Sequence, residues 1–154
     1  VKVDLYGIGL NESAEPQKIA AQVTTMSSLG ITTVIFENTD QLHGYYMEVT
    51  DMDKNQLVAS NLIFKDYPRD HQYAQPSIKT SKKIEDGGII LTLTSDIFAR
   101  GVQIAANLEG DFTDNYLDMI PGKNYEVVFV PYQTDKIDEA QFEISSYADY
   151  IVNL

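Results

Sequence analysis

The sequence predicts an all-β protein built from antiparallel β-sandwiches. Apolar and polar residues alternate over many short stretches, which is the period-2 pattern of strands with one face on a core. Clusters of Asp, Asn, Pro and Gly separate these stretches, and helix patterns do not alternate regularly with them. The 154 residues, 44% of them hydrophobic, suffice for one ordinary domain or two small ones.

The N-terminal stretch 13–26 fits two patterns. Ile19, Val23 and Met26 lie at helical spacing, whereas Ile19, Ala21 and Val23 alternate as in a strand. We favour the strand and keep the helix as the alternative.

Residues 45–64 predict two strands joined by a turn. Alternation runs through Tyr45, Met47 and Val49, and apolar residues return at 57–64. Between them, "DMDKNQ" supplies the Asp, Asn and Lys typical of turns. The segment 65–77, with two prolines and no periodicity, is typical of a linker. We therefore expect a smaller or incomplete β-sandwich module at 1–73 and a second module at 74–154.

The second module contains the clearest strand patterns. Residues 89–95 and 102–106 alternate and are close enough in sequence to form a hairpin, and 125–129 is a further strand. Pro121 and Gly122 suit the central positions of a type II turn, because proline presets its φ and glycine accepts a positive φ. The tail at 136–154 offers both a helical stripe and a strand around Phe142 and Ile144, and we favour the strand.

Charge and composition exclude several classes of function. Eleven basic against 23 acidic residues give 11 − 23 = −12, and the only basic cluster is Lys79, Lys82 and Lys83, so we expect no nucleic-acid binding. No apolar run approaches the roughly 20 residues of a membrane span, so we expect a soluble protein. With no cysteine, the chain has no disulfide, thiol nucleophile or thiolate metal site. The compartment stays open, and export is one option.

Several short motifs have a functional and a plain interpretation, and we favour the plain one in each case. Asp51, Asp53 and Asn55 have calcium-loop spacing, but Gln56 and Leu62 stand where an EF-hand needs Gly and Glu, so a hairpin turn is expected.

Asn11-Glu12 is the dipeptide that carries the acid/base of many retaining glycosidases, but the paired carboxylate and the barrel of about 250 residues do not fit this chain. His43 and His71 lie in polar surroundings and are expected to be exposed. We predict no catalytic residue, metal ligand or cofactor site.

Tyrosine makes up 10 of the 16 aromatic residues, and exposed aromatics often stack on sugar rings. The candidate sugar contacts around the hairpin and linker are Tyr45, Tyr67 and Tyr73. Alternation places Tyr45 and Tyr46 on opposite faces, so only one of that pair can join an exposed platform. Half-buried sheet tyrosines are the alternative.

Residues 90–129 resemble the C-terminal immunoglobulin-like domain of β-mannosidases of glycoside hydrolase family 2. The resemblance rests on Thr94-Ser95, on Ala99-Arg100, and on the run Asp114-Asn115-Tyr116-Leu117-Asp118-Met119-Ile120-Pro121-Gly122. Leu117 departs from the pattern, because an aromatic residue is common there. Residues 45–64 are more loosely similar to the end of the preceding sandwich module in the same enzymes.

The resemblance implies a non-catalytic C-terminal region that braces the catalytic barrel of a retaining β-mannosidase, an enzyme that releases terminal non-reducing β-D-mannose. The catalytic glutamates would lie in the barrel, upstream of this chain. The partners implied are that catalytic domain and an oligosaccharide. The alternative functions are a carbohydrate-binding module and a domain that forms homo-oligomers through an exposed sheet edge.

The carboxylates before the Pro-Gly turn have a structural explanation that does not depend on the family. Short polar side chains at turns and strand ends hydrogen-bond nearby backbone groups. We therefore predict that one structural motif, rather than a catalytic or metal site, is formed by Asp114, Asn115, Tyr116, Asp118, Pro121 and Gly122.

Overall fold

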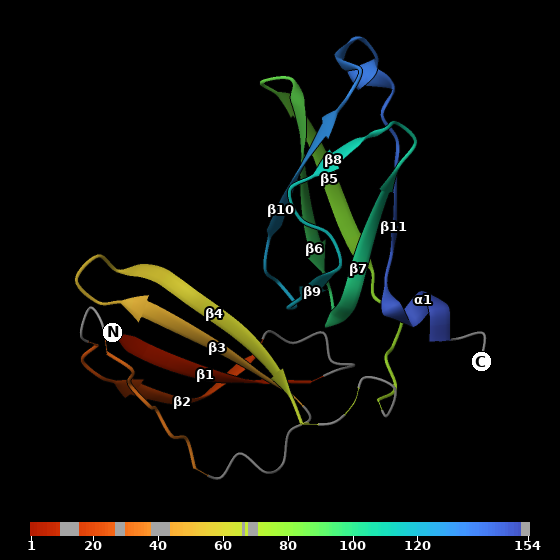
Figure 1. Ribbon diagram of the computed structural model, residues 1–154. Helices are drawn as coiled ribbons and strands as arrows, with labels where there is room; N and C mark the ends of the chain where they lie inside the picture. Colours follow the sequence, from red (N-terminus) through yellow and green to blue (C-terminus); the bar gives the residue numbers. More distant parts are fainter. Residues whose placement is uncertain (10–15, 27–29, 38–43, 66, 68–70, 152–154) are drawn as a thin grey trace. The chain divides into compact units, whose positions relative to one another are not determined.

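The computed structural model describes all residues except 10–15, 27–29, 38–43, 66, 68–70 and 152–154. The chain divides into two compact units, one holding Val1–Leu10 and Pro16–Gln72 and the other running from Tyr73 to the C-terminus. Each unit is described by itself below. In Figure 1 the strands of the first are red to yellow, and those of the second are green to blue.

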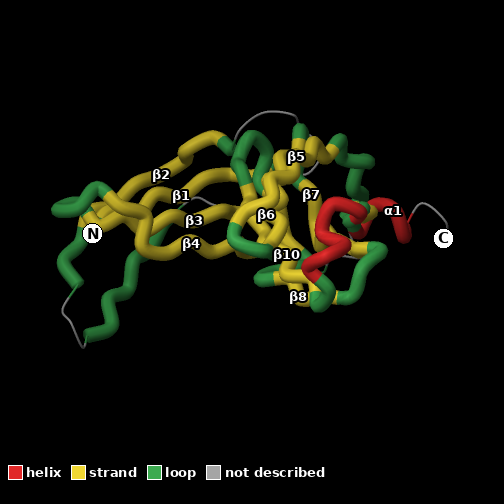
Figure 2. The backbone as a smooth tube through the Cα atoms, turned by 90° about the horizontal axis from the view of Figure 1, so that it is seen from above, coloured by secondary structure: helices red, strands yellow, loops and turns green. Residues whose placement is uncertain are grey.

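The first unit is a four-stranded antiparallel sheet in the order β2-β1-β3-β4. Its strands are β1 (Lys2–Ile8), β2 (Gln17–Val23), β3 (Gly44–Asp51) and β4 (Gln56–Phe64). Figure 2 shows the four lying side by side in this order. The strand interpretation of the 13–26 stretch is confirmed for Gln17–Val23. The predicted β3-β4 hairpin is confirmed by the antiparallel pairing of the two strands, whose register shifts once, between Val49 and Thr50.

Burial in this sheet is confined mainly to the two central strands. Val3, Leu5 and Ile8 of β1 are buried, whereas β2 and β4 are largely exposed along their length. Both outer strands carry large apolar side chains with 43% or more of their surface exposed: Ile19, Val23, Leu57, Val58 and Ile63. The apolar surface of this sheet is therefore only partly covered by the described residues.

The second unit is an immunoglobulin-like β-sandwich of seven strands. One sheet has the order β5-β6-β10-β8 and the other the order β11-β7-β9, and all pairings are antiparallel. Sheets of four and three strands match the constant-type immunoglobulin arrangement. The strands are β5 (Ile78–Glu85), β6 (Gly88–Ser95), β7 (Ala99–Ala106), β8 (Gly110–Phe112), β9 (Leu117–Met119), β10 (Tyr125–Pro131) and β11 (Phe142–Ser145). The expected hairpin between 89–95 and 102–106 is wrong, because β6 and β7 lie in different sheets: β6 pairs with β5 and β10, and β7 pairs with β11 and β9.

The core of the sandwich is formed by the inward-facing residues of its strands, as the alternation in the sequence predicts. Ile89, Leu91 and Leu93 of β6 are fully buried, and they pack with Val127 and Phe129 of the paired strand β10. The facing sheet contributes its own buried residues to the same cluster: Ala99, Val102, Ile104 and Met119. Each large side chain buried in this way contributes about 1.5–3 kcal/mol, so the core is the main source of this unit's stability.

The C-terminal tail is a strand only in part. It contains the 3₁₀-helix η2 (Thr134–Glu139), the strand β11, and the short helix α1 (Tyr147–Ile151). The favoured strand is thus confirmed for Phe142–Ser145 and wrong for the residues on either side. Helix α1 begins after Ser146, whose backbone N–H and hydroxyl both donate to the Asp149 carboxylate at 2.6 and 3.1 Å. A carboxylate at the third helical position that binds back to the cap residue is a helix-start signal.

Candidate functional site

The polar run before the Pro-Gly turn forms a set of side-chain to backbone hydrogen bonds around strand β7. Asn115 Oδ1 accepts a hydrogen bond from the Ile104 N–H at 2.8 Å, and Asn115 Nδ2 donates to the Ile104 carbonyl at 2.9 Å. The β7-β9 ladder ends at the pair Val102 and Leu117. The Asn115 side chain therefore continues the pairing of β7 ahead of Leu117, the first strand residue of β9.

Asp118 serves the irregular part of the same strand. The β7-β9 register shifts between Ala99 and Val102, and Gly101 in that bulge has φ +55°. The Gly101 N–H donates to Asp118 Oδ1 at 2.8 Å. A bulge leaves backbone groups without a ladder partner, and the carboxylate supplies one here.

Asp114 and Tyr116 shape the chain on either side of Asn115. Asp114 Oδ1 accepts a hydrogen bond from the Asn115 N–H at 2.8 Å, and Asn115 Oδ1 also accepts one from the Tyr116 N–H at 3.0 Å. Tyr116 itself has φ +62°, a conformation uncommon for a residue with a side chain. These local bonds hold that backbone in place, and the Tyr116 ring is left 67% exposed.

The turn at Pro121-Gly122 has the geometry of a type II turn. The Lys123 N–H donates to the Ile120 carbonyl at 3.2 Å, and Gly122 has φ +75°. The Gly122 N–H donates to the Ser95 carbonyl at 3.2 Å, which fixes the turn to the end of β6.

The tyrosines considered as sugar contacts lie in different environments. Tyr45 and Tyr73 are only 5% and 8% exposed, whereas Tyr67 is 71% exposed. Tyr45 sits in the central strand β3, and Tyr73 packs edge-on against the Tyr147 ring at 5.6 Å. Burial raises the pKa of Tyr73. Stacking on a sugar needs an open ring face, so Tyr67 is the only one of the three that offers it.

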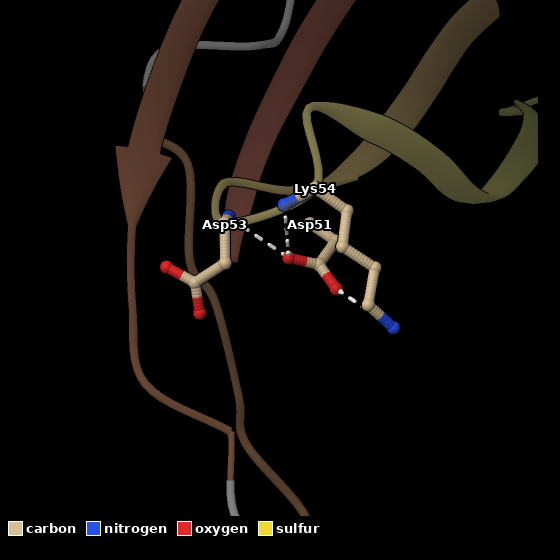
Figure 3. Close-up of polar contacts among 3 residues, drawn as sticks. All are labelled: Asp51, Asp53 and Lys54. Carbon is tan, nitrogen blue, oxygen red and sulfur yellow. Dashed lines mark hydrogen bonds and ion pairs between the residues drawn. The ribbon is translucent and has the colours of Figure 1, made fainter.

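The loop with calcium-like spacing is the turn of the β3-β4 hairpin, as expected (Figure 3). Asp51 Oδ1 accepts hydrogen bonds from the backbone N–H groups of Asp53 at 2.9 Å and Lys54 at 3.2 Å. Asn55 takes φ +49°, which completes the reversal of the chain. Asp51 is thus engaged with the turn itself. In the part of the chain that the structure describes, no three His, Asp or Glu residues cluster closely enough to hold a metal ion.

The expectation that both histidines are exposed is wrong for His71. His71 is 9% exposed, and its ring lies 6.4 Å from that of Phe64. The faces of a histidine ring are apolar enough to pack against an aromatic neighbour such as Phe64. The polar residues next to His71 in the sequence do not reveal this packing, so they gave the wrong expectation. His43 and the Asn11-Glu12 dipeptide lie outside the described residues.

The sequence interpretation missed the Tyr132–Asp111 pair. The Tyr132 hydroxyl donates to Asp111 Oδ1 at 3.0 Å, and the tyrosine is 66% exposed. The only available sequence signal is the continued alternation of β10 through Val130 to Tyr132, on the side opposite Phe129. That signal places the ring outside the sandwich but does not identify Asp111 as its neighbour.

None of the helices in the described ranges has the length and apolarity needed to cross a membrane.

Comparison with known proteins gives a family and a structural relative. Residues 73–150, half of the chain, match the model of a mannosidase Ig-fold domain family. A crystal structure of β-D-mannosidase from Dictyoglomus thermophilum matches with a TM-score of 0.59 and 20% sequence identity. That match covers 95% of this chain but only 19% of the mannosidase, so the chain spans a small part of that relative's length. No curated protein matches the chain significantly.

Proposed function

This chain belongs to the mannosidase Ig-fold domain family, and from this membership we propose that it is the non-catalytic C-terminal region of a β-mannosidase. In the intact enzyme it would brace the catalytic barrel, which would hydrolyse terminal non-reducing β-D-mannose. The observation that carries the proposal is the family match over residues 73–150. The similarity to the Dictyoglomus thermophilum β-D-mannosidase supports it, because that match extends over both units of this chain.

The hydrogen bonds of the 114–122 run support a structural role for its carboxylates. Asp118 and Asp114 each accept a bond from a backbone N–H, and Asn115 uses both ends of its amide on Ile104. A catalytic acid or nucleophile must instead be directed at a substrate. We include these residues in the proposal as the motif that shapes β7 and its neighbours.

The exposed apolar surface of the first unit supports its assignment as an incomplete sandwich. Two-layer packing is the usual way for a sheet to bury its apolar face, and here β2 and β4 stay exposed along most of their length. The segment 30–37, "GITTVIFE", has the β-branched composition of a strand. Thr32, Val34 and Phe36 are half-buried, while Ile31 and Ile35 are 99% and 69% exposed. Additional strands from a longer chain would pair with this segment and cover it.

Two experiments test the proposal. First, the purified 154-residue chain is assayed with p-nitrophenyl β-D-mannopyranoside, and no hydrolysis above the buffer blank is expected; turnover that grows with protein concentration would contradict the non-catalytic role. Second, the coding sequence that precedes Val1 is determined. We expect it to encode a (β/α)₈ barrel with two glutamates placed for retaining chemistry. An upstream sequence without such a barrel would overturn the assignment.

The bracing role is tested in the intact enzyme. A version that ends before Val1 should unfold at a lower temperature than the full chain and lose activity in parallel. Substitutions confined to residues 1–154 that unfold these units should have the same effect. An unchanged melting temperature and unchanged kcat/KM after truncation would exclude bracing.

A further inference from the structure

Strands β8 and β10 direct a compact group of side chains away from the sandwich core. In their ladder Phe129 lies opposite Phe112, and the two rings pack inside with centroids 4.7 Å apart. The next outward pair is Val130 opposite Asp111. Because successive side chains alternate between faces, Val130 and Asp111 point out of the sandwich.

The pairing continues by one more outward step. Beyond the pair of Pro131 and Gly110, the Tyr132 N–H donates to the Glu109 carbonyl at 3.0 Å. Tyr132 and Glu109 therefore occupy the outward position next to Val130 and Asp111. All four side chains are exposed, and Tyr132 and Val130 retain 66% and 48% of their surface.

The Tyr132 ring is held in one orientation at this surface. Its hydroxyl donates to Asp111 Oδ1 at 3.0 Å, so one edge is fixed while most of the ring stays open to solvent. The two carboxylates also act on the phenol: the hydrogen bond to Asp111, then its charge, and further the charge of Glu109 raise the pKa of Tyr132. Asp111 therefore contacts the phenol directly, and Glu109 stands opposite Tyr132 in the extended pairing.

The backbone beneath the group permits little adjustment. A side chain at Gly110 would place its Cβ 2.5 Å from the Val130 carbonyl oxygen and 2.6 Å from the Phe129 ring. Only glycine allows β8 to approach β10 this closely. The spacing between Tyr132 and Asp111 is thus set by the strands and does not depend on a flexible loop.

We propose that Tyr132, Val130, Asp111 and Glu109 form a surface binding site for a neutral saccharide. The open aromatic face with Val130 beside it suits the C–H face of a pyranose ring, and the carboxylate oxygens accept hydrogen bonds from its hydroxyls. An anionic sugar is disfavoured, since both charges at the site are negative and the whole chain carries −12. The inference rests on contacts within the second unit alone, so it is tested independently of the proposed parent enzyme.

The test is an NMR titration of the 154-residue chain with methyl β-D-mannopyranoside and with mannobiose. Saturable shifts are expected at the amides of Val130 and Asp111 and at the Tyr132 ring, with a Kd on the order of millimolar, as befits a small open site. Methyl glucuronate should bind at least several-fold more weakly. Equal or stronger binding of the anionic sugar would overturn the proposal.

Three variants test whether the saccharide binds at Tyr132 and Asp111. Tyr132→Ala should weaken binding at least tenfold, and Asp111→Asn by several-fold. Tyr116→Ala is the matched control, because Tyr116 is equally exposed in the same unit, at 67%, but none of the described carboxylates is hydrogen-bonded to its hydroxyl. It should bind as the unmodified chain does, and urea unfolding checks that every variant is folded.

Two results would overturn the proposal: no saturable shift with either mannoside, or binding that survives Tyr132→Ala, including binding centred on Tyr67. A result against this site leaves the parent assignment untouched, because that assignment is decided by the upstream sequence and the truncated enzyme.

Discussion

Asn115 pairs its side-chain amide with both backbone hydrogen-bonding groups of Ile104, accepting at 2.8 Å and donating at 2.9 Å. One side chain thereby does what a strand residue does in a ladder, two residues before β9 begins at Leu117. The same oxygen also accepts from the Tyr116 N–H, where the backbone has φ +62°. Strand pairing and the unusual turn are thus held by a single residue.

Asn115→Asp should destabilise the second unit by about 1–3 kcal/mol at pH 7. The carboxylate keeps the acceptor but cannot donate to the Ile104 carbonyl, so a partly buried acceptor loses its partner. The measurement is urea unfolding followed by far-UV circular dichroism.

Asn124→Asp is the control for this substitution. Asn124 is exposed next to β10, and the same change there should cost less than about 0.5 kcal/mol. Equal losses at the two positions would show that the amide bridge to Ile104 is not the cause.

Gly110→Ala should be far more harmful than Gly87→Ala. At Gly110 the new methyl group meets the Val130 carbonyl oxygen at 2.5 Å, so β8 must move away from β10, and we expect a loss of roughly 2–4 kcal/mol. A Cβ added at Gly87 would meet no atom within 4 Å apart from its own chain neighbours. Only the positive φ of +78° opposes alanine there, and we expect a loss of stability of about 1 kcal/mol. Comparing the two urea midpoints checks this, and a larger loss at Gly87 would contradict it.

Lys18→Met should lower the urea midpoint of the first unit. The Asp4 side chain is 7% exposed and lies between the ammonium groups of Lys2 at 2.9 Å and Lys18 at 3.0 Å. Burial raises the pKa of Asp4, but the hydrogen bonds from the two lysines outweigh it and leave the pKa below its usual value. Removing Lys18 leaves a buried carboxylate with one cation, although solvent near the exposed lysines limits the cost.

Lys54→Met provides the control for Lys18→Met. Lys54 is 73% exposed and 3.9 Å from Asp51, so removing it should change the unfolding free energy by less than about 0.5 kcal/mol. Thermal or urea unfolding monitored on first-unit resonances by NMR distinguishes the two variants. A larger effect of Lys54→Met would reverse the assignment of the stabilising pair.

Asp149 makes the stability of the second unit depend on pH in the acidic range. The Ser146 backbone N–H, and further the Gln75 amide and the Ser146 hydroxyl, hydrogen-bond its carboxylate and lower its pKa despite a smaller opposing effect of burial. A carboxyl whose pKa is lower folded than unfolded stabilises the protein above the unfolded value, about 3.9. That contribution disappears as the pH falls through the folded pKa.

Asp149→Asn should therefore be less stable than the unmodified chain at pH 7, and the difference should shrink as the pH falls from 5 to 3. The measurement is the urea midpoint of both proteins across this range. A difference that stays constant from pH 7 to pH 3 would show that the carboxylate charge plays no part.

The sequence alone was sufficient wherever structure follows from near neighbours. Alternation in 89–95 predicted β6 and its buried face, because the side-chain direction in a strand changes with every residue. The Pro121-Gly122 pair predicted its turn, because the φ restrictions of proline and the φ freedom of glycine are local. The turn at Asp51 also belongs to this class, since Asp51 binds groups two and three residues away.

The tertiary structure decided everything that depends on distant partners. Asn115 and Ile104 are 11 residues apart, and Asp118 and Gly101 are 17, so the polar run showed that such bonds would form but not with which groups. The burial of Tyr45 and His71 and the exposure of Tyr132 likewise depend on which strands and rings lie alongside them. Periodicity fixes the face of a strand on which a side chain lies, whereas packing decides whether that face is covered.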